Sequence, residues 1–219
     1  MTDCAKGGVL FLHGLGRRAG SMRMLAAAAS AEGYATFSPA YPGRRRSLTG
    51  IVDHLAAKVA AFDASFGDPL HIVTHSLGGL VARALIEARP PGRLGRVVML
   101  APPNGGSEVA DLIYRVRLNR ILLGPVGAHL RTRRIADDEK LLGKVGFELG
   151  IIAGSRGLDP ISPRLIFARP NDGKVAVAAT HVEGMRDHIV LAVSHTLMVY
   201  DRRVVAQTMA FLKQGRFRR

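Results

Sequence analysis

Short apolar runs alternate with stretches of helical periodicity along most of the chain. Six runs have the length and composition of buried β-strands, at residues 9–12, 34–38, 70–73, 96–101, 147–153 and 188–193. Apolar residues at helical spacing lie between them, and the helices predicted in this way cover residues 25–31, 51–62, 80–88 and 202–213. Strands that alternate with helices of this length predict an α/β fold with a doubly wound, mainly parallel sheet.

Polar and turn-forming residues mark the ends of these elements. Ser21 stands where it would cap the helix over residues 25–31, and Gly33 stands where that helix would end. Ligands bind to sheets of this kind at the carboxyl ends of the strands. His13, Ser76 and His195 each follow a predicted strand closely, so we expect all three at one edge of the sheet.

The length of 219 residues is that of a single domain, which we expect to span residues 1–219. The segment 104–146 is long for a connection between two strands, so we expect it to contain helices that form a small cap. Its apolar residues include Val109, Ile113 and Val116, and arginines such as Arg117 lie nearby. This mixture is compatible with binding of an apolar acyl chain or with a weak contact to an anionic membrane surface. An amphipathic helix packed on the sheet is the alternative, which we favour over membrane contact.

The net charge of +14 raises the question of nucleic-acid binding. The basic clusters at 44–46, 131–134 and 216–219 do not alternate with aromatic side chains as stacking platforms would, so we expect no nucleic-acid partner. The single cysteine, Cys4, excludes an internal disulfide and agrees with a cytoplasmic location. No cysteine or histidine cluster has metal-ligand spacing, and we expect neither a metal nor another cofactor.

The sequence Thr74-His75-Ser76-Leu77-Gly78-Gly79 lies between a predicted strand and a predicted helix. A serine in this position, with glycine two residues later, is typical of a nucleophile elbow. A serine hydroxyl is a poor nucleophile, and a tight turn exposes it to a neighbouring base. Thr74 departs from the usual G-x-S-x-G pattern, in which glycine occupies the first position.

Four other segments can be interpreted together with this elbow. They are the strand and loop at 10–16 (LFLHGLG), the loop at 101–107 (APPNGGS), and the two short stretches 171–175 (NDGKV) and 194–196 (SHT). With these motifs, the chain resembles the α/β-hydrolase superfamily, in particular its small lipase- and esterase-like members. The resemblance spans residues 9–196, and the order serine, aspartate, histidine is the order of that superfamily.

The resemblance implies a catalytic triad with Ser76 as the nucleophile and His195 as the general base. Asp172, which Gly173 follows in a tight turn, is the first candidate for the acid, and Asp159 is the main alternative. Asp187 is too close in sequence to the last strand to fold back easily. His181 and His188 compete with His195 but lie before or within that strand.

The oxyanion hole requires two backbone N–H donors, for which the resemblance indicates Leu77 and Leu15. His13 is expected to tie down the loop that contains Leu15, and His75 is expected to be a packing residue rather than a second base.

The function that follows is hydrolysis of carboxylic esters through an acyl-enzyme, with a small-molecule ester that carries an apolar acyl group as the substrate. A thioesterase or acyltransferase with the same triad is the alternative, because the fold does not determine the acyl acceptor. A non-catalytic binding protein of this fold is a further alternative, and the presence of the serine, aspartate and histidine argues against it.

Overall fold

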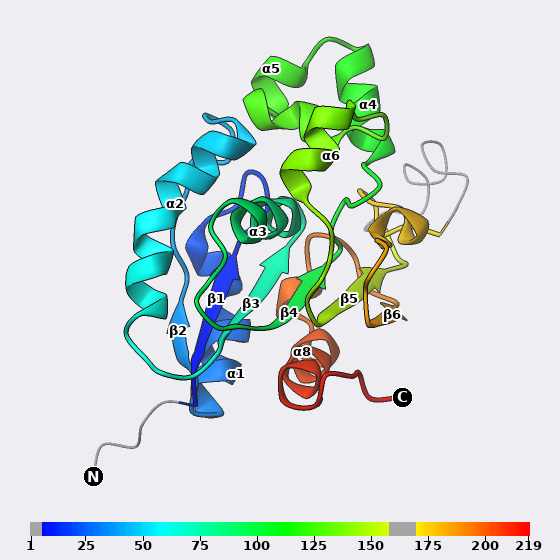
Figure 1. Cartoon of the computed structure of the whole chain (residues 1–219). Coiled ribbons are helices and arrows are strands. Elements are labelled where there is room, and N and C mark those ends of the chain that lie inside the picture. The colour runs from blue at the N-terminus through cyan, green and yellow to red at the C-terminus, as the bar shows by residue number, and fades with distance from the viewer. Residues whose placement is uncertain (1–5, 158–169) are drawn as a thin grey trace.

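The computed structural model describes residues 6–157 and 170–219. Its centre is a six-stranded sheet in the order β2-β1-β3-β4-β5-β6, in which every neighbouring pair is parallel (Figure 1). The strands are β1 (Gly8–Leu12), β2 (Ala35–Phe37), β3 (Leu70–His75), β4 (Leu94–Leu100), β5 (Leu149–Gly154) and β6 (Asp187–Leu191). All six strands predicted from the apolar runs are therefore confirmed.

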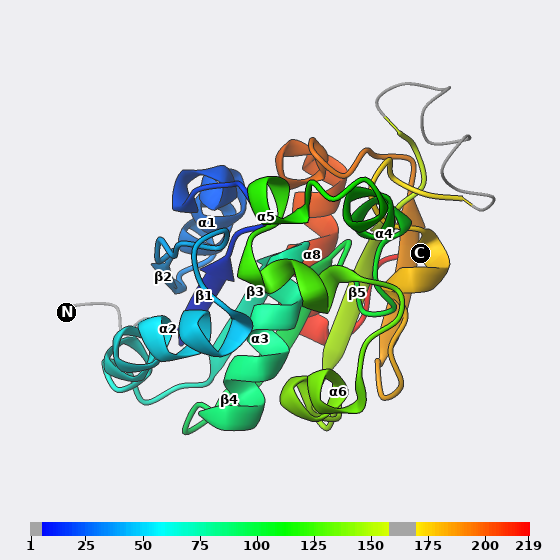
Figure 2. The same cartoon turned by 90° about the horizontal axis from the view of Figure 1, so that it is seen from above.

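Helices cover both faces of the sheet, as Figure 2 shows from above. Helices α1 (Arg23–Ala31) and α8 (Arg202–Gln214) lie on one face. Helices α2 (Leu48–Asp63) and α3 (Leu77–Ala88) pack on the other. The predicted doubly wound α/β arrangement is confirmed.

The central strands are buried on both faces. In β1, Val9 and Phe11 belong to the core beneath α1 and α8, while Leu10 and Leu12 belong to the core beneath α2 and α3. Every residue of β1 and β3 is buried. This two-sided burial explains why these strands appear in the sequence as continuous apolar runs rather than as an alternating pattern.

The predicted cap of helix α1 is wrong. Ser21 lies in the 3-10 helix Ala19–Met22, and its hydroxyl donates to the carbonyl of Arg18 at 2.8 Å. Helix α1 then begins at Arg23 with Met22 at the N-cap. Ser21 thus lies inside the preceding 3-10 helix, one position before the N-cap from which a side-chain oxygen accepts the first N–H groups of a helix.

Residues 104–146, called the cap segment below, lie over the carboxyl ends of the strands (Figure 1). The segment contains α4 (Glu108–Arg115), α5 (Asn119–Leu122), the 3-10 helix η2 (Pro125–Leu130) and α6 (Ala136–Leu142), which packs beside α3. The predicted small helical cap is confirmed. In the part of the chain that the structure describes, no helix has the length and apolar character needed to cross a membrane.

Candidate active site

Ser76 stands at the sharp turn between β3 and α3. Its backbone has φ 53° and ψ −123°, a conformation that residues other than glycine rarely adopt. The turn is held because the Ser76 N–H donates to the carbonyl of Leu100 and the Gly79 N–H donates to the carbonyl of Ser76, both at 2.8 Å. Strain of this kind is typical of functional residues whose surroundings enforce one position.

The two glycines after Ser76 are required by close packing. A Cβ on Gly78 would overlap the carbonyl oxygen of Leu12, and one on Gly79 would lie 2.9 Å from Cβ of Pro102. Thr74, by contrast, is a fully buried residue of β3 that pairs with Leu12 and Met99. The threonine in the first position of the motif is therefore compatible with the elbow.

Asp172 and His195 form a buried pair at the same edge of the sheet. The distance from Asp172 Oδ2 to His195 Nδ1 is 2.7 Å, and the two residues are 2% and 5% exposed. The other carboxylate oxygen, Oδ1, accepts hydrogen bonds from the N–H groups of Lys174 at 3.0 Å and Val175 at 2.8 Å. The His195 N–H also donates to the Asp172 carbonyl at 2.9 Å, so the loops after β5 and β6 are joined.

The other candidates for the acid and the base do not contact this pair in the described part of the chain. Asp159 falls outside the described residues. Asp187 begins β6, where it accepts a hydrogen bond from the Phe217 N–H. His188 lies 2.9 Å from the hydroxyl of Thr180 and against the ring of His181, and burial lowers the pKa of His188 to about 4.

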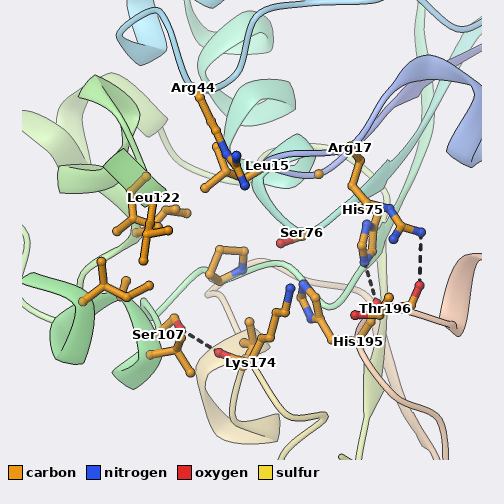
Figure 3. Close-up of a pocket in the computed structure, with 18 residues that line it drawn as sticks. Leu15, Arg17, Arg44, His75, Ser76, Ser107, Leu122, Lys174, His195 and Thr196 are labelled. Atoms are coloured by element: carbon orange, nitrogen blue, oxygen red, sulfur yellow. Dashed lines mark hydrogen bonds between the residues drawn. The ribbon is translucent and has the colours of Figure 1, made fainter. Parts of the chain in front are cut away.

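A pocket of about 310 Å³ lies between this edge and the cap segment (Figure 3). Ser76 and His195 both line it, together with Leu15 and residues of α4 and α5. Among the described residues, no hydrogen bond joins Ser76 to His195. Such bonds often become short only when substrate is bound, so the arrangement is compatible with proton transfer between the two side chains.

Two backbone N–H groups beside Ser76 are available as donors. Leu77 is the first residue of α3, so its N–H has no partner within the helix. No acceptor for the Leu15 N–H is found in residues 6–157 and 170–219. A Cβ on Gly14 would lie only 3.2 Å from Ser76 Cβ, which shows how closely this loop approaches the elbow.

The loop that contains Leu15 is fixed by His13 and Tyr41. The two rings stack at 4.0 Å with an angle of 9° between their planes, and the Tyr41 hydroxyl donates to the His13 carbonyl. Burial lowers the pKa of His13. The expected structural role of His13 is therefore seen in its contacts, whereas the partner Tyr41 could not be identified from the sequence.

His75 and Arg17 hold the loop that carries His195. His75 Nε2 donates to the His195 carbonyl at 2.9 Å, and Arg17 Nη2 donates to the Thr196 carbonyl at 3.1 Å (Figure 3). Burial, reinforced by the nearby His195, lowers the pKa of His75 well below its usual range, so its ring is neutral. The sequence predicted packing for His75 but gave no indication of these long-range bonds.

Comparison with known proteins agrees with the fold. The mature form of the Bacillus licheniformis lipase BlEst2 superposes with a TM-score of 0.76 at 20% identity, over 98% of this chain and 94% of that one. The metagenomic carboxyl esterase MGS0156 gives a TM-score of 0.68 at 18% identity, over 89% of this chain and 66% of that one. At these identities the likeness concerns the fold.

A sequence match is found with a 3-phosphoshikimate 1-carboxyvinyltransferase of Syntrophobacter fumaroxidans, which is 35% identical over 99 residues. The match covers 43% of this chain and only 23% of the length of that curated relative. The sequence pattern of the alpha/beta hydrolase family, in contrast, matches residues 9–208. Because that match extends over nearly the whole chain, the protein belongs to the alpha/beta hydrolase family.

Proposed function

We propose that the protein is a serine hydrolase that cleaves carboxylic esters, with Ser76 as nucleophile, His195 as general base and Asp172 as the acid that orients it. The observation that carries the proposal is the strained Ser76 turn at a pocket that it shares with His195, whose Nδ1 is held by Asp172 at 2.7 Å. The fold shared with a lipase and a carboxyl esterase supports the ester as substrate class. A cytoplasmic location remains a prediction from the single cysteine.

The reaction follows from the hydrogen bonds of the pair. Because Asp172 accepts a hydrogen bond from the Nδ1–H group of His195, Nε2 carries a lone pair that can take the Ser76 proton. The serine oxygen then adds to the ester carbonyl, and the N–H groups of Leu15 and Leu77 stabilise the oxyanion. His195 returns the proton to the departing alcohol, and water repeats these steps to release the acid and free Ser76.

The test is substitution of Ser76 by alanine. We expect hydrolysis of p-nitrophenyl butyrate to fall roughly 10³-fold or more, because the acyl-enzyme can no longer form. Ser65→Ala is the matched control, since Ser65 is exposed and its hydroxyl bonds only to the Phe62 carbonyl. If a folded Ser76→Ala protein keeps the wild-type rate, the assignment is wrong.

The cap segment is the proposed site of weak contact with anionic membranes. Its surface exposes the apolar residues Leu112, Val116, Leu118, Ile121 and Leu122. Arg115, Arg117 and Arg120 lie among them and, within the described part of the chain, have no ion pair. A surface with apolar and cationic side chains suits a bilayer that contains anionic lipids.

Ile121, whose exposed fraction is 73%, is the residue to change. We expect Ile121→Ser to weaken co-sedimentation with vesicles of phosphatidylglycerol and phosphatidylcholine by about threefold, because one apolar side chain no longer enters the interface. Val190→Ser, an exposed aliphatic position on β6, is the control. Equal binding of all three proteins, or equal binding to vesicles of phosphatidylcholine alone, would contradict the membrane contact.

A further inference from the structure

The pocket around Ser76 has an unbalanced charge. Three of its lining residues are cationic, Arg17, Arg44 and Lys174, and none of the residues found to line it is an aspartate or glutamate. In the cap segment, by contrast, Arg131 pairs with Asp111 and Arg134 pairs with Glu139. Other arginines of this basic chain therefore do have carboxylate partners, whereas among residues 6–157 and 170–219 the three cations of the pocket have none.

Two of these three cations are free to meet a ligand. The Arg17 guanidinium is engaged, since it donates to the Thr196 carbonyl and lies over the ring of Tyr200. For the Arg44 guanidinium and the Lys174 ammonium, the described part of the structure contains no hydrogen-bond acceptor or ion-pair partner. Both side chains are exposed to solvent at the pocket.

The two free cations lie on either side of the nucleophile. Figure 3 shows Arg44 beside Leu15 on one side of Ser76, and Lys174 beside His195 on the other. The wall contributed by the cap segment contains one polar residue, Ser107, whose hydroxyl donates to the Lys174 carbonyl. The rest of this wall is apolar and consists of Val109, Ala110, Ile113, Leu122, Leu123 and Leu130. One wall of the pocket is thus mainly apolar, and two cations flank Ser76.

The backbones of both cationic residues are fixed. A Cβ on Gly124 would overlap the carbonyl oxygen of Arg44, so the cap segment presses directly on this loop. The Lys174 N–H donates to Asp172 at 3.0 Å, and its carbonyl accepts a hydrogen bond from Ser107 at 2.6 Å. The side chains therefore start from defined positions at the pocket although their charged ends are solvated.

We propose that this pocket selects esters that carry an anionic group, a phosphate or a carboxylate, in the alcohol part beside the scissile bond, and that Arg44 and Lys174 determine this specificity. The inference rests on the hydrolase function proposed above. In the reaction, water adds across the acyl C–O bond. The carboxylic acid retains the apolar chain, which lies against the cap segment, and the alcohol leaves with its anionic group.

The test uses three octanoyl esters with the same acyl chain, those of glycerol, glycerol 3-phosphate and glycerate. For each protein, kcat/KM on an anionic ester is divided by kcat/KM on the neutral one. Comparison of this ratio between proteins removes the difference in intrinsic reactivity between the esters. We expect Arg44→Gln and Lys174→Gln each to lower the ratio by about fivefold, the worth of a solvent-exposed charge pair, and the double variant to lower it further.

Arg45→Gln is the matched control, because it removes the same charge one residue away from Arg44 and Arg45 does not line the pocket. Its ratio should equal that of the wild type, and 0.5 M KCl should reduce the wild-type ratio by screening exposed charges. The glycerol 3-phosphate ester tests a phosphate and the glycerate ester tests a carboxylate, so the larger ratio identifies which anionic group the pocket prefers.

The inference is overturned if the Arg44 and Lys174 variants change the ratio no more than Arg45→Gln does. A different result would contradict the proposed hydrolase function itself. In that case the wild type would hydrolyse none of the three esters, and Ser76→Ala would behave like the wild type. A ratio that falls only in the Arg44 and Lys174 variants supports the inference.

Discussion

The edge of the sheet that holds Ser76, Asp172 and His195 differs in construction from the cap segment that faces it. At the edge, polar side chains are buried and their positions are fixed by hydrogen bonds between loops, as between His195 and Asp172 or between His75 and His195. The outer surface of the cap segment instead exposes apolar residues and arginines that have no ion pair with any residue that the structure describes. The buried edge is thus the part whose side chains have fixed positions, as the proposed catalytic role requires, whereas the outer side chains of the cap segment are solvated.

The two regions are nevertheless firmly joined. The Arg134 side chain is only 4% exposed and donates to the carbonyls of Pro103, Asn104 and His129. Arg83 of α3 donates to the side chain of Asn104 and to the carbonyl of Gly143. Both ends of the cap segment are therefore attached through buried arginines, and this attachment keeps the apolar wall opposite Ser76.

The comparison makes its strongest prediction at the edge of the sheet. Asp172→Asn should lower kcat for p-nitrophenyl butyrate by roughly 10²- to 10⁴-fold, because an amide that donates to Nδ1 stabilises the wrong tautomer of His195. Asp201→Asn, at the N-cap of α8 and outside the pocket, is the control. A rate within a factor of three of the wild type would instead favour another acid, such as Asp159.

The attachment of the cap segment should affect stability. Arg134→Met leaves three carbonyls without their donor, and we expect the free energy of unfolding in urea to fall by about 2–4 kcal/mol. Arg133→Met replaces an exposed neighbour and should leave this free energy almost unchanged. If the two variants unfold at the same urea concentration, Arg134 does not anchor the cap segment.

A smaller effect is expected from the buried histidines of the edge. Burial lowers the pKa of His13 and, more strongly, of His75, so the unfolded chain binds more protons than the folded one below pH 6.5. Their contribution to stability is therefore fully present above about pH 6.5. It is lost as the pH falls towards the lower folded-state pKa values.

Urea unfolding between pH 7.5 and 5 measures this dependence. His75→Gln should show a shallower loss of stability with acidification than the wild type, because one proton-linked group has been removed. His54→Gln, which changes a half-buried histidine of α2 outside the pocket, should retain the wild-type slope. Equal slopes for the wild type and His75→Gln would show that burial of His75 does not contribute.

Much of the fold could be predicted because the local pattern reflects it directly. β1 and β3 are buried on both faces and therefore appear as uninterrupted apolar runs, and the glycines at 78 and 79 mark the tight turn after Ser76. The structure also brings Asp172 against His195, as the order of the motifs suggested.

What the sequence could not supply depends on contacts between distant segments. The bond from His75 to the carbonyl of His195 spans 120 positions, and the stacking of Tyr41 on His13 follows from how two loops meet. Ser21 failed as a cap for a local reason, because a 3-10 helix contains it and α1 begins only at Arg23 with Met22 at the N-cap. Propensity alone does not decide between such alternatives.

Labelling with a fluorophosphonate is the most direct test of whether Ser76 is an activated nucleophile. The reagent reacts with serines that a neighbouring base activates, and peptide mapping by mass spectrometry locates the adduct. We expect one adduct on Ser76 of the folded protein, with no labelling of Ser76→Ala and strongly reduced labelling of His195→Ala. An unlabelled wild type, or an adduct that persists in Ser76→Ala, would contradict it.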